Sequence, residues 1–283
     1  MTDWKIRQNR DGGWAYSGKG RSWTEPTAYV LLAQTATRID RPSFEAGIQF
    51  LRNTQRPDGG WSPAPEVAES TWVTAVAALL PAEAIGAASI KRALAWLNDH
   101  AGEESTLLFR FQQWLHGIHG DGSVGWPWFP GAAAWVTPTS IGILALEHAL
   151  ARGDDRNLRE RVRLAREFLV LHMCSDGGWN HGSAHALGQD LNSYPETTGQ
   201  GLTALRSFSG DNPGAIEKAK QAARRHYAKC STAEGLAWLR MGLAAHGEVP
   251  PARRDLASPP VPRTTLDAAL TAIAAAPRNP LLG

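Results

Sequence analysis

Three glutamates stand at similar places in the chain, where a carboxyl could act as an acid. Each precedes a threonine and an apolar segment, in Glu25-Pro26-Thr27, Glu69-Ser70-Thr71 and Glu196-Thr197-Thr198. If these segments are buried helices around a shared apolar cavity, loss of water would raise the carboxyl pKa and keep a proton available near neutral pH. The alternative is structural, because the positive end of a helix also favours a carboxylate. Glu25, Glu69 and Glu196 are therefore candidate catalytic acids.

Glu196 is the strongest of the three candidates. It follows the longest and most polar link of the chain, Asn180–Pro195. That link contains Tyr194, His185 and His181, whose side chains could tune the protonation of Glu196 or bind a polar group of a ligand. These three residues are candidate substrate contacts.

Tryptophan supplies a second group of candidates. The densest aromatic stretch is Trp126-Pro127-Trp128-Phe129-Pro130, followed by Trp135, and its two prolines stiffen the backbone. One interpretation is hydrophobic cover over one end of the fold. The other is a wall of aromatic faces around an apolar or cationic ligand. We include as candidate substrate-binding residues Trp72, Trp126, Trp128 and Trp135.

Residue types that bind metals gather in one segment. They are His172, Cys174, Asp176, His181 and His185. Their spacing matches no standard structural zinc pattern. The sequence therefore predicts no metal and no other cofactor.

A repeat must position these side chains. Asp-Gly-Gly-Trp occurs at Asp11–Trp14, Asp58–Trp61 and Asp176–Trp179, and a degenerate copy runs over Asp121–Trp126. Repetition at this spacing indicates a repeat architecture. Gly-Gly permits a sharp turn, Asp accepts hydrogen bonds from nearby backbone N–H groups, and Trp covers the junction. The tetrads are predicted to be structural.

Each link leads into a helix that is apolar nearly all round, which predicts burial. These inner helices are expected over Ala28–Ala36, Trp72–Leu80, Leu107–Leu115, Ser140–Ala149, Gly199–Phe208 and Ala233–Ala245. Helices with one charged face are expected outside, over Arg41–Thr54, Ala87–His100, Asn157–Met173, Gly214–Lys229 and Thr264–Ala275. Together they predict an all-α fold, an α/α toroid with about six inner helices inside an outer helical ring.

The chain ends suggest how this ring closes. The last predicted helix has no partner, so we expect it to pack beside the first repeat. The Pro-rich segment 249–262 then acts as a strap leading to a closing C-terminal helix, and residues 1–283 form a single domain.

Composition excludes several classes of protein. The net charge of +2, with no long Lys/Arg run, argues against a nucleic-acid partner. No apolar run approaches the ~18 residues of a membrane span, so no integral membrane segment is expected. Met1–Arg10 contains no apolar signal segment and the chain has 2 cysteines, which together predict a cytoplasmic protein. The oligomeric state is left open.

Gln-x-x-Asp-Gly-Gly-Trp followed by a buried helix resembles the repeat of squalene–hopene cyclases, oxidosqualene cyclases and protein prenyltransferase β subunits. The copies at Gln8–Trp14 and Gln55–Trp61 carry the full motif, and the resemblance extends over about residues 8–210. It implies the toroid fold, and a structural role for the Gln and Trp of the motif.

For function, the resemblance is partial. The cyclases protonate their substrate with the middle carboxylate of Asp-x-Asp-Asp-Thr, and this chain keeps single glutamates at that place. The zinc-binding Asp-x-Cys of prenyltransferases is absent around both cysteines. The resemblance implies an enzyme that starts the cyclisation or isomerisation of an isoprenoid-like apolar substrate with an acid. The alternatives are a non-catalytic toroid that binds a lipid or peptide and, third, a prenyltransferase.

Overall fold

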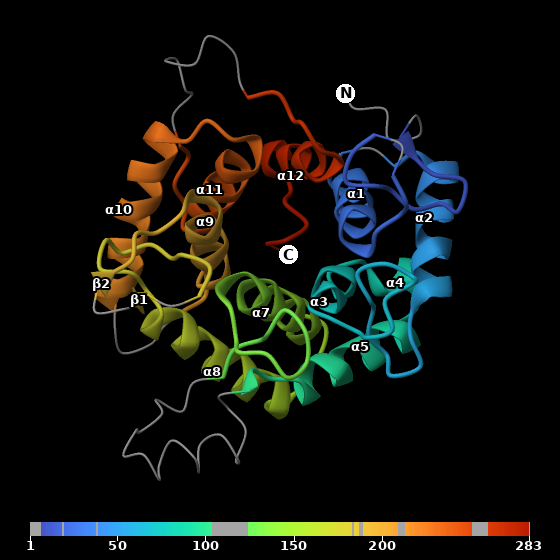
Figure 1. Cartoon of the computed structure of the whole chain (residues 1–283), viewed down its shortest axis with the longest axis horizontal. Helices are drawn as coiled ribbons and strands as arrows, with labels where there is room; N and C mark the ends of the chain where they lie inside the picture. Colours follow the sequence, from blue (N-terminus) through green and yellow to red (C-terminus); the bar gives the residue numbers. More distant parts are fainter. Residues whose placement is uncertain are drawn as a thin grey trace.

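The computed structural model describes residues 7–18, 20–37, 39–103, 124–182, 184–186, 189–208, 213–250 and 260–282. Helices form a closed ring around a central axis (Figure 1). The inner helices are α1 (Thr24–Ala36), α3 (Val73–Ala78), α7 (Val136–Leu150), α9 (Pro195–Ala204), α11 (Ala233–Ala245) and α12 (Thr265–Ala275). The outer side carries α2 (Arg41–Thr54), α4 (Ala82–Ile85), α5 (Ala87–Asp99), α8 (Arg156–Leu171) and α10 (Pro213–Lys229). The predicted α/α toroid is confirmed.

Each inner helix contacts the next around the ring, from α1 through α3, α7, α9 and α11 to α12 and back to α1. The C-terminal helix α12 thus lies between α11 and α1, as expected, but in the inner ring (Figure 1). Its assignment to the outer helices was wrong because buried apolar positions outnumber its charged ones. The inner helix expected over Leu107–Leu115, and most of the Pro-rich strap, lie outside the described residues.

The second and third Asp-Gly-Gly-Trp tetrads turn the chain from an outer helix into the next inner one, and the first precedes the inner helix α1. The first glycine has a positive φ in all three copies, at Gly12, Gly59 and Gly177. A Cβ added at Gly12 would lie 2.3 Å from the carbonyl oxygen of Ala46 on α2, so no other residue fits. Asp11 accepts hydrogen bonds from the backbone N–H of Gly13 and the hydroxyl of Ser22, which confirms the predicted turn role.

The tryptophans of the tetrads are fully buried. Trp61 donates its indole N–H to the carbonyl of Leu51 at the end of the preceding outer helix, 2.7 Å away, and Trp179 does the same to Leu169 at 2.6 Å. Both bonds go to carbonyls of the last turns of an outer helix, where backbone acceptors lack full helical pairing or accept a second donor. The tetrad tryptophans therefore hold the inner ring against the outer ring.

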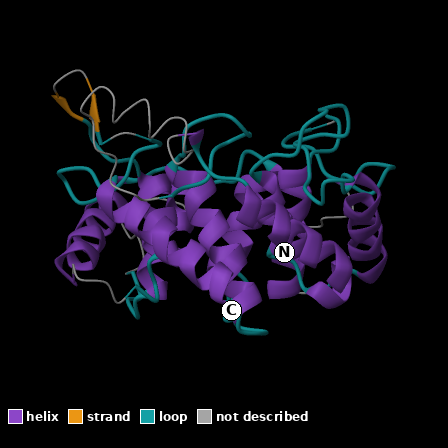
Figure 2. Cartoon of the chain, turned by 90° about the horizontal axis from the view of Figure 1, so that it is seen from below, coloured by secondary structure: helices purple, strands orange, loops and turns teal. Residues whose placement is uncertain are grey.

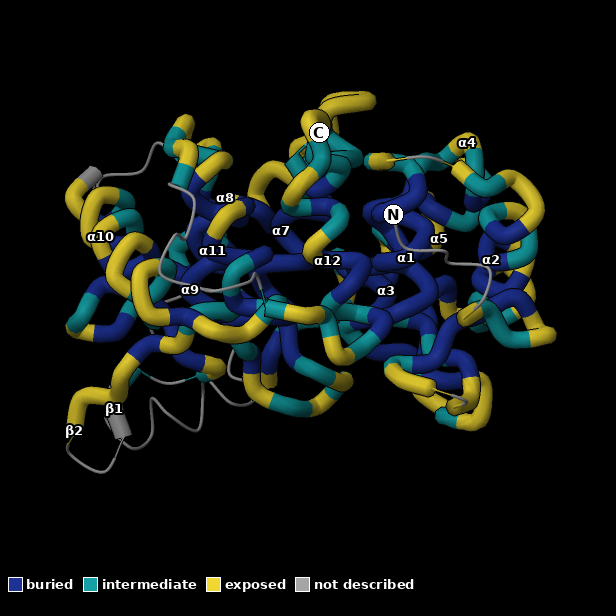
Figure 3. Tube along the Cα trace, turned by 90° about the horizontal axis from the view of Figure 1, so that it is seen from above, coloured by how far each residue is buried: buried dark blue, intermediate teal, exposed yellow. Residues whose placement is uncertain are grey.

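The ring has two different ends. The links between outer and inner helices gather at one end, together with the two-stranded hairpin β1 (His185–Ala186) and β2 (Gln189–Asp190), the only strands in the described residues (Figure 2). The C-terminus lies at the opposite end (Figures 2 and 3). Buried residues form a continuous belt between the two ends (Figure 3). No helix in the described ranges is long and apolar enough to cross a bilayer.

Candidate functional site

A cavity of about 250 Å³ lies at the end of the ring where the inner helices begin. Three carboxylates reach it from the first turns of α1, α9 and α11, and they are Glu25, Glu196 and Glu234. Aromatic side chains form much of the remaining wall, and they are Tyr29, Trp72, Trp128 and Trp238. The cavity thus combines acidic groups with aromatic surface.

A hydrogen bond repeated at four inner helices explains how most of these residues meet. The backbone N–H of each repeat tryptophan donates to a threonine hydroxyl in the following inner helix, 13 residues later for Trp14, Trp61 and Trp126 and 19 residues later for Trp179. The accepting threonines are Thr27, Thr74, Thr139 and Thr198. The residue two places before each threonine lines the cavity, and the four are Glu25, Trp72, Thr137 and Glu196.

Glu234 is a site residue that the sequence analysis missed. It lies two residues after Thr232, whose hydroxyl caps α11 by accepting from the N–H of Gly235. Glu25 and Glu196 also lie two residues after the N-cap positions of their helices, Trp23 and Tyr194. In the sequence, the same offset of two residues from the predicted helix start at Ser231-Thr232 identifies Glu234.

Glu25 accepts a hydrogen bond from the hydroxyl of Tyr16. Burial raises the pKa of Glu25 to about 7, and the Tyr16 hydrogen bond opposes that rise. The helix end and the hydroxyl both favour the charged carboxylate, but desolvation is the larger effect. Glu25 therefore changes its charge near neutral pH.

Glu234 behaves similarly for a partly different reason. Burial is the main cause that raises its pKa to about 7, and the nearby charges of Glu25, Glu196 and Asp267 add to it. Within the described residues, no hydrogen bond reaches the Glu234 carboxyl. Charge on Glu25 therefore disfavours charge on Glu234.

The aromatic walls are held in fixed orientations. Trp72 and Trp128 meet edge to face, with ring centroids 4.9 Å apart and planes at 87°. The backbone N–H of Trp72 also donates to the carbonyl of Trp128. On the other side Tyr29 and Trp238 meet edge to face at 6.3 Å. Ring faces so placed can attract a positive charge.

His181 also lines the cavity. The ring centroids of His181 and Tyr194 lie 5.3 Å apart. The backbone carbonyl of His181 accepts a hydrogen bond from the N–H of Val136 at the start of α7. Tyr194 itself is largely exposed and does not line the cavity. His185 lies on β1, and its backbone stands opposite that of Asp190 on β2.

Glu69 is not part of this site. Its side chain is exposed on the link before α3 and does not line the cavity. The sequence interpretation aligned Thr71 with Thr27, whereas Thr74 accepts the hydrogen bond from Trp61. The shift of three residues gives the cavity position to Trp72 instead of Glu69.

Two of the candidate tryptophans also lie elsewhere. Trp126 is 2% exposed, donates its indole N–H to the carbonyl of Leu97, and has the guanidinium of Arg161 3.6 Å above its ring. It is thus the structural tryptophan of the degenerate repeat. Trp135 is half-buried and packs against Gly182, outside the cavity wall. Trp72 and Trp128 are the candidates that the cavity contains.

The segment rich in metal-ligand residue types has other roles. Cys174 is buried, Asp176 accepts from Ser193 and Gly178, and the ring of His172 stacks on Phe168 with centroids 3.8 Å apart. In the part of the chain that the structure describes, no group of three or more His, Cys, Asp and Glu side chains is arranged to hold a metal ion.

Comparison with known proteins gives one match in sequence. A 48-residue segment is 48% identical to squalene–hopene cyclase from Alicyclobacillus acidocaldarius. The segment is 17% of this chain and only 8% of that cyclase, so the two proteins share homology over a small part of their lengths. No protein-family profile matches the chain.

Solved structures extend the similarity over nearly the whole chain. The type II terpene cyclase MstE from Scytonema aligns with a TM-score of 0.56 and 17% identity, covering 94% of this chain and 72% of that one. An endo-β-1,4-glucanase of the GH8 class from an Achatina fulica gut metagenomic library aligns with a TM-score of 0.58 and 17% identity, covering 96% and 95%. At these identities the likeness concerns the fold alone.

The two enzyme classes with this ring catalyse different reactions, so the ring by itself does not select one of them. The sequence match falls on the cyclase side. The chain therefore has partial homology to squalene–hopene cyclase and the α/α-toroid fold of type II terpene cyclases.

Proposed function

We propose that the protein converts a small isoprenoid-like substrate by acid-initiated isomerisation or cyclisation in the cavity at the head of the inner helices. The observation that carries this proposal is the pair Glu25 and Glu234. Two carboxyls with pKa values raised to about 7 face one aromatic-walled cavity. A carboxyl that stays protonated near neutral pH is the group that such a reaction requires.

In this proposal Tyr16 gives the two carboxyls different roles, Glu25 as the base and Glu234 as the acid. Its hydroxyl donates to Glu25 and so favours the charged form of that carboxyl. Glu234, whose pKa the Glu25 charge raises further, keeps its own proton and acts as the donor. The substrate π bond takes this proton, forming a C–H bond and leaving a carbocation and the Glu234 carboxylate. Loss of a proton from an adjacent carbon to Glu25 or Glu196 then restores a double bond and neutral charge.

The aromatic wall stabilises the cation. Trp72 and Trp128 form one fixed pair and Tyr29 and Trp238 another, so a cation that lies over a ring face is stabilised without rearrangement of the rings. Cation–π attraction in a desolvated site contributes about 2 kcal/mol or more per well-placed ring. Because the rings gain this energy only when charge develops, they stabilise the transition state more than the substrate.

Cavity size limits the substrate. At about 250 Å³ the cavity falls below the roughly 300–1,000 Å³ typical of small-molecule sites. A compact isoprenoid, or the reacting end of a longer one, fits that volume. A variant of MstE has been solved in complex with geranylgeranyl dihydroxybenzoate, its substrate. For the present chain the isoprenoid class remains part of the proposal.

The second candidate function is binding without chemistry. Asp-x-Asp-Asp occurs nowhere in the chain, so the usual cyclase acid is missing. A ring that only binds a lipid or peptide would keep the aromatic wall and would not depend on the proton of Glu234.

The test is conversion of linear isoprenoid alcohols and their diphosphates, followed by mass spectrometry of extracted products. We expect Glu234→Gln to lower conversion by about 100-fold or more, the usual effect of losing a general acid. Glu69→Gln is the matched control at an exposed link position and should leave conversion unchanged. Loss of conversion only in Glu196→Gln would move the donor to α9. Binding without conversion by the wild type would establish the second function.

A further inference from the structure

We propose that the C-terminal segment Ala276–Leu282 plugs the far end of the ring and that Leu281 sets how deep a linear apolar ligand can enter. This inference rests on the proposed function for the position of the ligand head at the carboxylates. It adds a length limit, and a residue that determines it, to the cavity described above.

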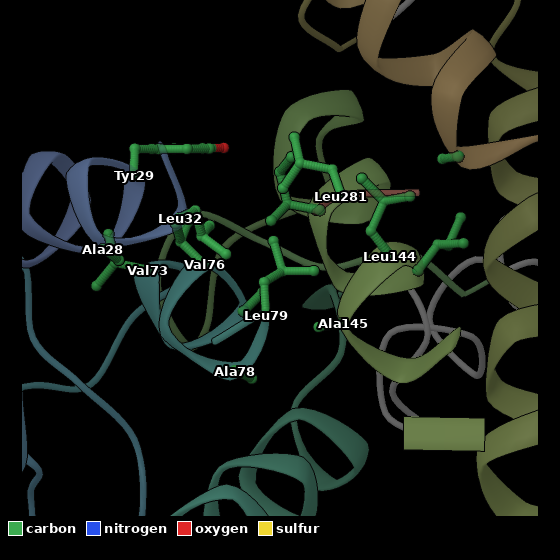
Figure 4. Close-up of a cluster of buried hydrophobic side chains, with 14 of the residues drawn as sticks. Ala28, Tyr29, Leu32, Val73, Val76, Ala78, Leu79, Leu144, Ala145 and Leu281 are labelled. Atoms are coloured by element: carbon green, nitrogen blue, oxygen red, sulfur yellow. The ribbon is translucent and has the colours of Figure 1, made fainter. Parts of the chain in front are cut away.

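The plug lies on the ring axis. After α12 the chain turns inward and ends in the centre of the ring (Figure 1). Leu281 is completely buried, and it points into the cluster that contains Leu32, Leu79 and Leu144 (Figure 4). These leucines come from α1, α3 and α7, so one tail residue fills the space that three inner helices leave between them.

The segment is anchored by polar contacts as well. The guanidinium of Arg206, at the end of α9, donates to the carbonyl of Leu281 at 2.9 Å and also pairs with Glu147 at 3.0 Å. The Asn279 side chain accepts from the N–H of Leu281 at 2.9 Å. Moving the segment would leave the buried Leu281 carbonyl without its charged donor, which costs free energy. The bond to Arg206 therefore holds the segment in place.

The plug does not line the cavity and lies beyond it along the inner helices. Glu25 and Tyr29 line the cavity on α1, and Leu32 lies seven residues beyond Glu25, about 10 Å along the helix. On α7 the same distance separates Thr137 at the cavity from Leu144 at the plug. An extended ligand with its head at the carboxylates would therefore point its tail at Leu281.

The test uses straight-chain saturated alcohols of increasing length, with affinity measured by quenching of tryptophan fluorescence. These probes have no double bond, so their binding does not depend on proton transfer. Leu281→Ala should improve the affinity for alcohols about two carbons longer than the wild-type optimum by about tenfold relative to shorter ones. Leu281→Phe should shift the optimum to shorter chains.

Leu169→Ala is the matched control. It removes the same atoms from an equally buried leucine between α8 and its inner neighbours, so the length preference should stay unchanged. An unaltered optimum in both Leu281 variants, or an equal shift in the control, would overturn the plug. So would failure of every alcohol to bind. A shift in the optimum without conversion of isoprenoids would support the plug while rejecting the proposed chemistry.

Discussion

Each cavity glutamate is subject to two opposing effects. The positive end of its helix favours the carboxylate, while loss of water favours the neutral acid. For Glu25 and Glu234 the pKa rises, so desolvation is the larger effect. The sequence could not decide this balance, because part of the cover comes from Leu266 and Leu270 on α12, at the far end of the chain.

Glu25 and Glu234 should make the stability of the protein depend on pH. Their folded pKa of about 7 exceeds the ordinary value of 4.5, so the folded state holds protons that the unfolded state releases in between. The free energy of unfolding should therefore fall as pH rises from 4.5 to about 7, and stay level above it. Because residual solvent screens both carboxyls, we expect the free energy of unfolding to fall by only roughly 2 kcal/mol over this range. Urea unfolding at a series of pH values measures it.

The double variant Glu25→Gln/Glu234→Gln is the control for this measurement. Burial lowers the pKa of His148 to about 4, which contributes the opposite slope between 4 and 6.5 in both proteins. The difference between wild type and variant removes that contribution. A difference that stays constant from pH 5 to 8 would mean that the two carboxyls are solvated.

At the scale of the element, the link between tetrad and inner helix determines which residue reaches the cavity. Helix positions were predictable from periodicity, since α2 and α11 begin and end where the pattern placed them. The start of α3 was not predictable, because Thr71 and Thr74 both stand near it. Only the hydrogen bond from Trp61 selects Thr74, and that choice replaces Glu69 by Trp72 in the cavity.

This register predicts unequal effects for two threonines. Thr74→Val should destabilise the protein by about 1–3 kcal/mol, because the buried N–H of Trp61 loses its acceptor. Thr71→Val should be neutral or slightly stabilising, since the buried Thr71 hydroxyl has no partner among the described residues. Urea unfolding of both variants measures the difference. Equal losses would show that the chosen register is wrong.

The tetrad tryptophans should matter for stability and not for ligands. Trp179→Ala removes a fully buried indole and its bond to Leu169, so we expect a loss of about 3–5 kcal/mol. Trp128→Ala is the comparison at the cavity. It should weaken ligand binding and change the melting temperature only a little. Scanning calorimetry and ligand titration separate the two effects. Lost binding at an unchanged melting temperature in Trp179→Ala would contradict a structural role.

At the scale of the whole molecule, closure of the ring depends on the C-terminal helix. The repeats alone leave α1 and α11 without a neighbour on one side, and α12 packs against both. Its N-terminus is fixed by a capping box between Thr264 and Asp267, and the backbone N–H of Thr265 donates to the carbonyl of Tyr16. That last bond joins the closing helix to the residue that holds Glu25. The end of the chain therefore completes both the ring and the site.

Truncation should separate these two contributions of the C-terminal region. A chain that ends at Ala275 keeps α12 and loses only the plug, so it should fold cooperatively and still titrate near pH 7. A chain that ends at Pro262 also loses α12, which exposes the apolar faces of α1 and α11 and the carboxyl of Glu234. We expect it to lose cooperative unfolding, as followed by tryptophan fluorescence in urea, since the buried area per residue falls and two inner helices lack a partner. A cooperative transition of wild-type midpoint in the shorter chain would mean that the repeats close the ring without α12.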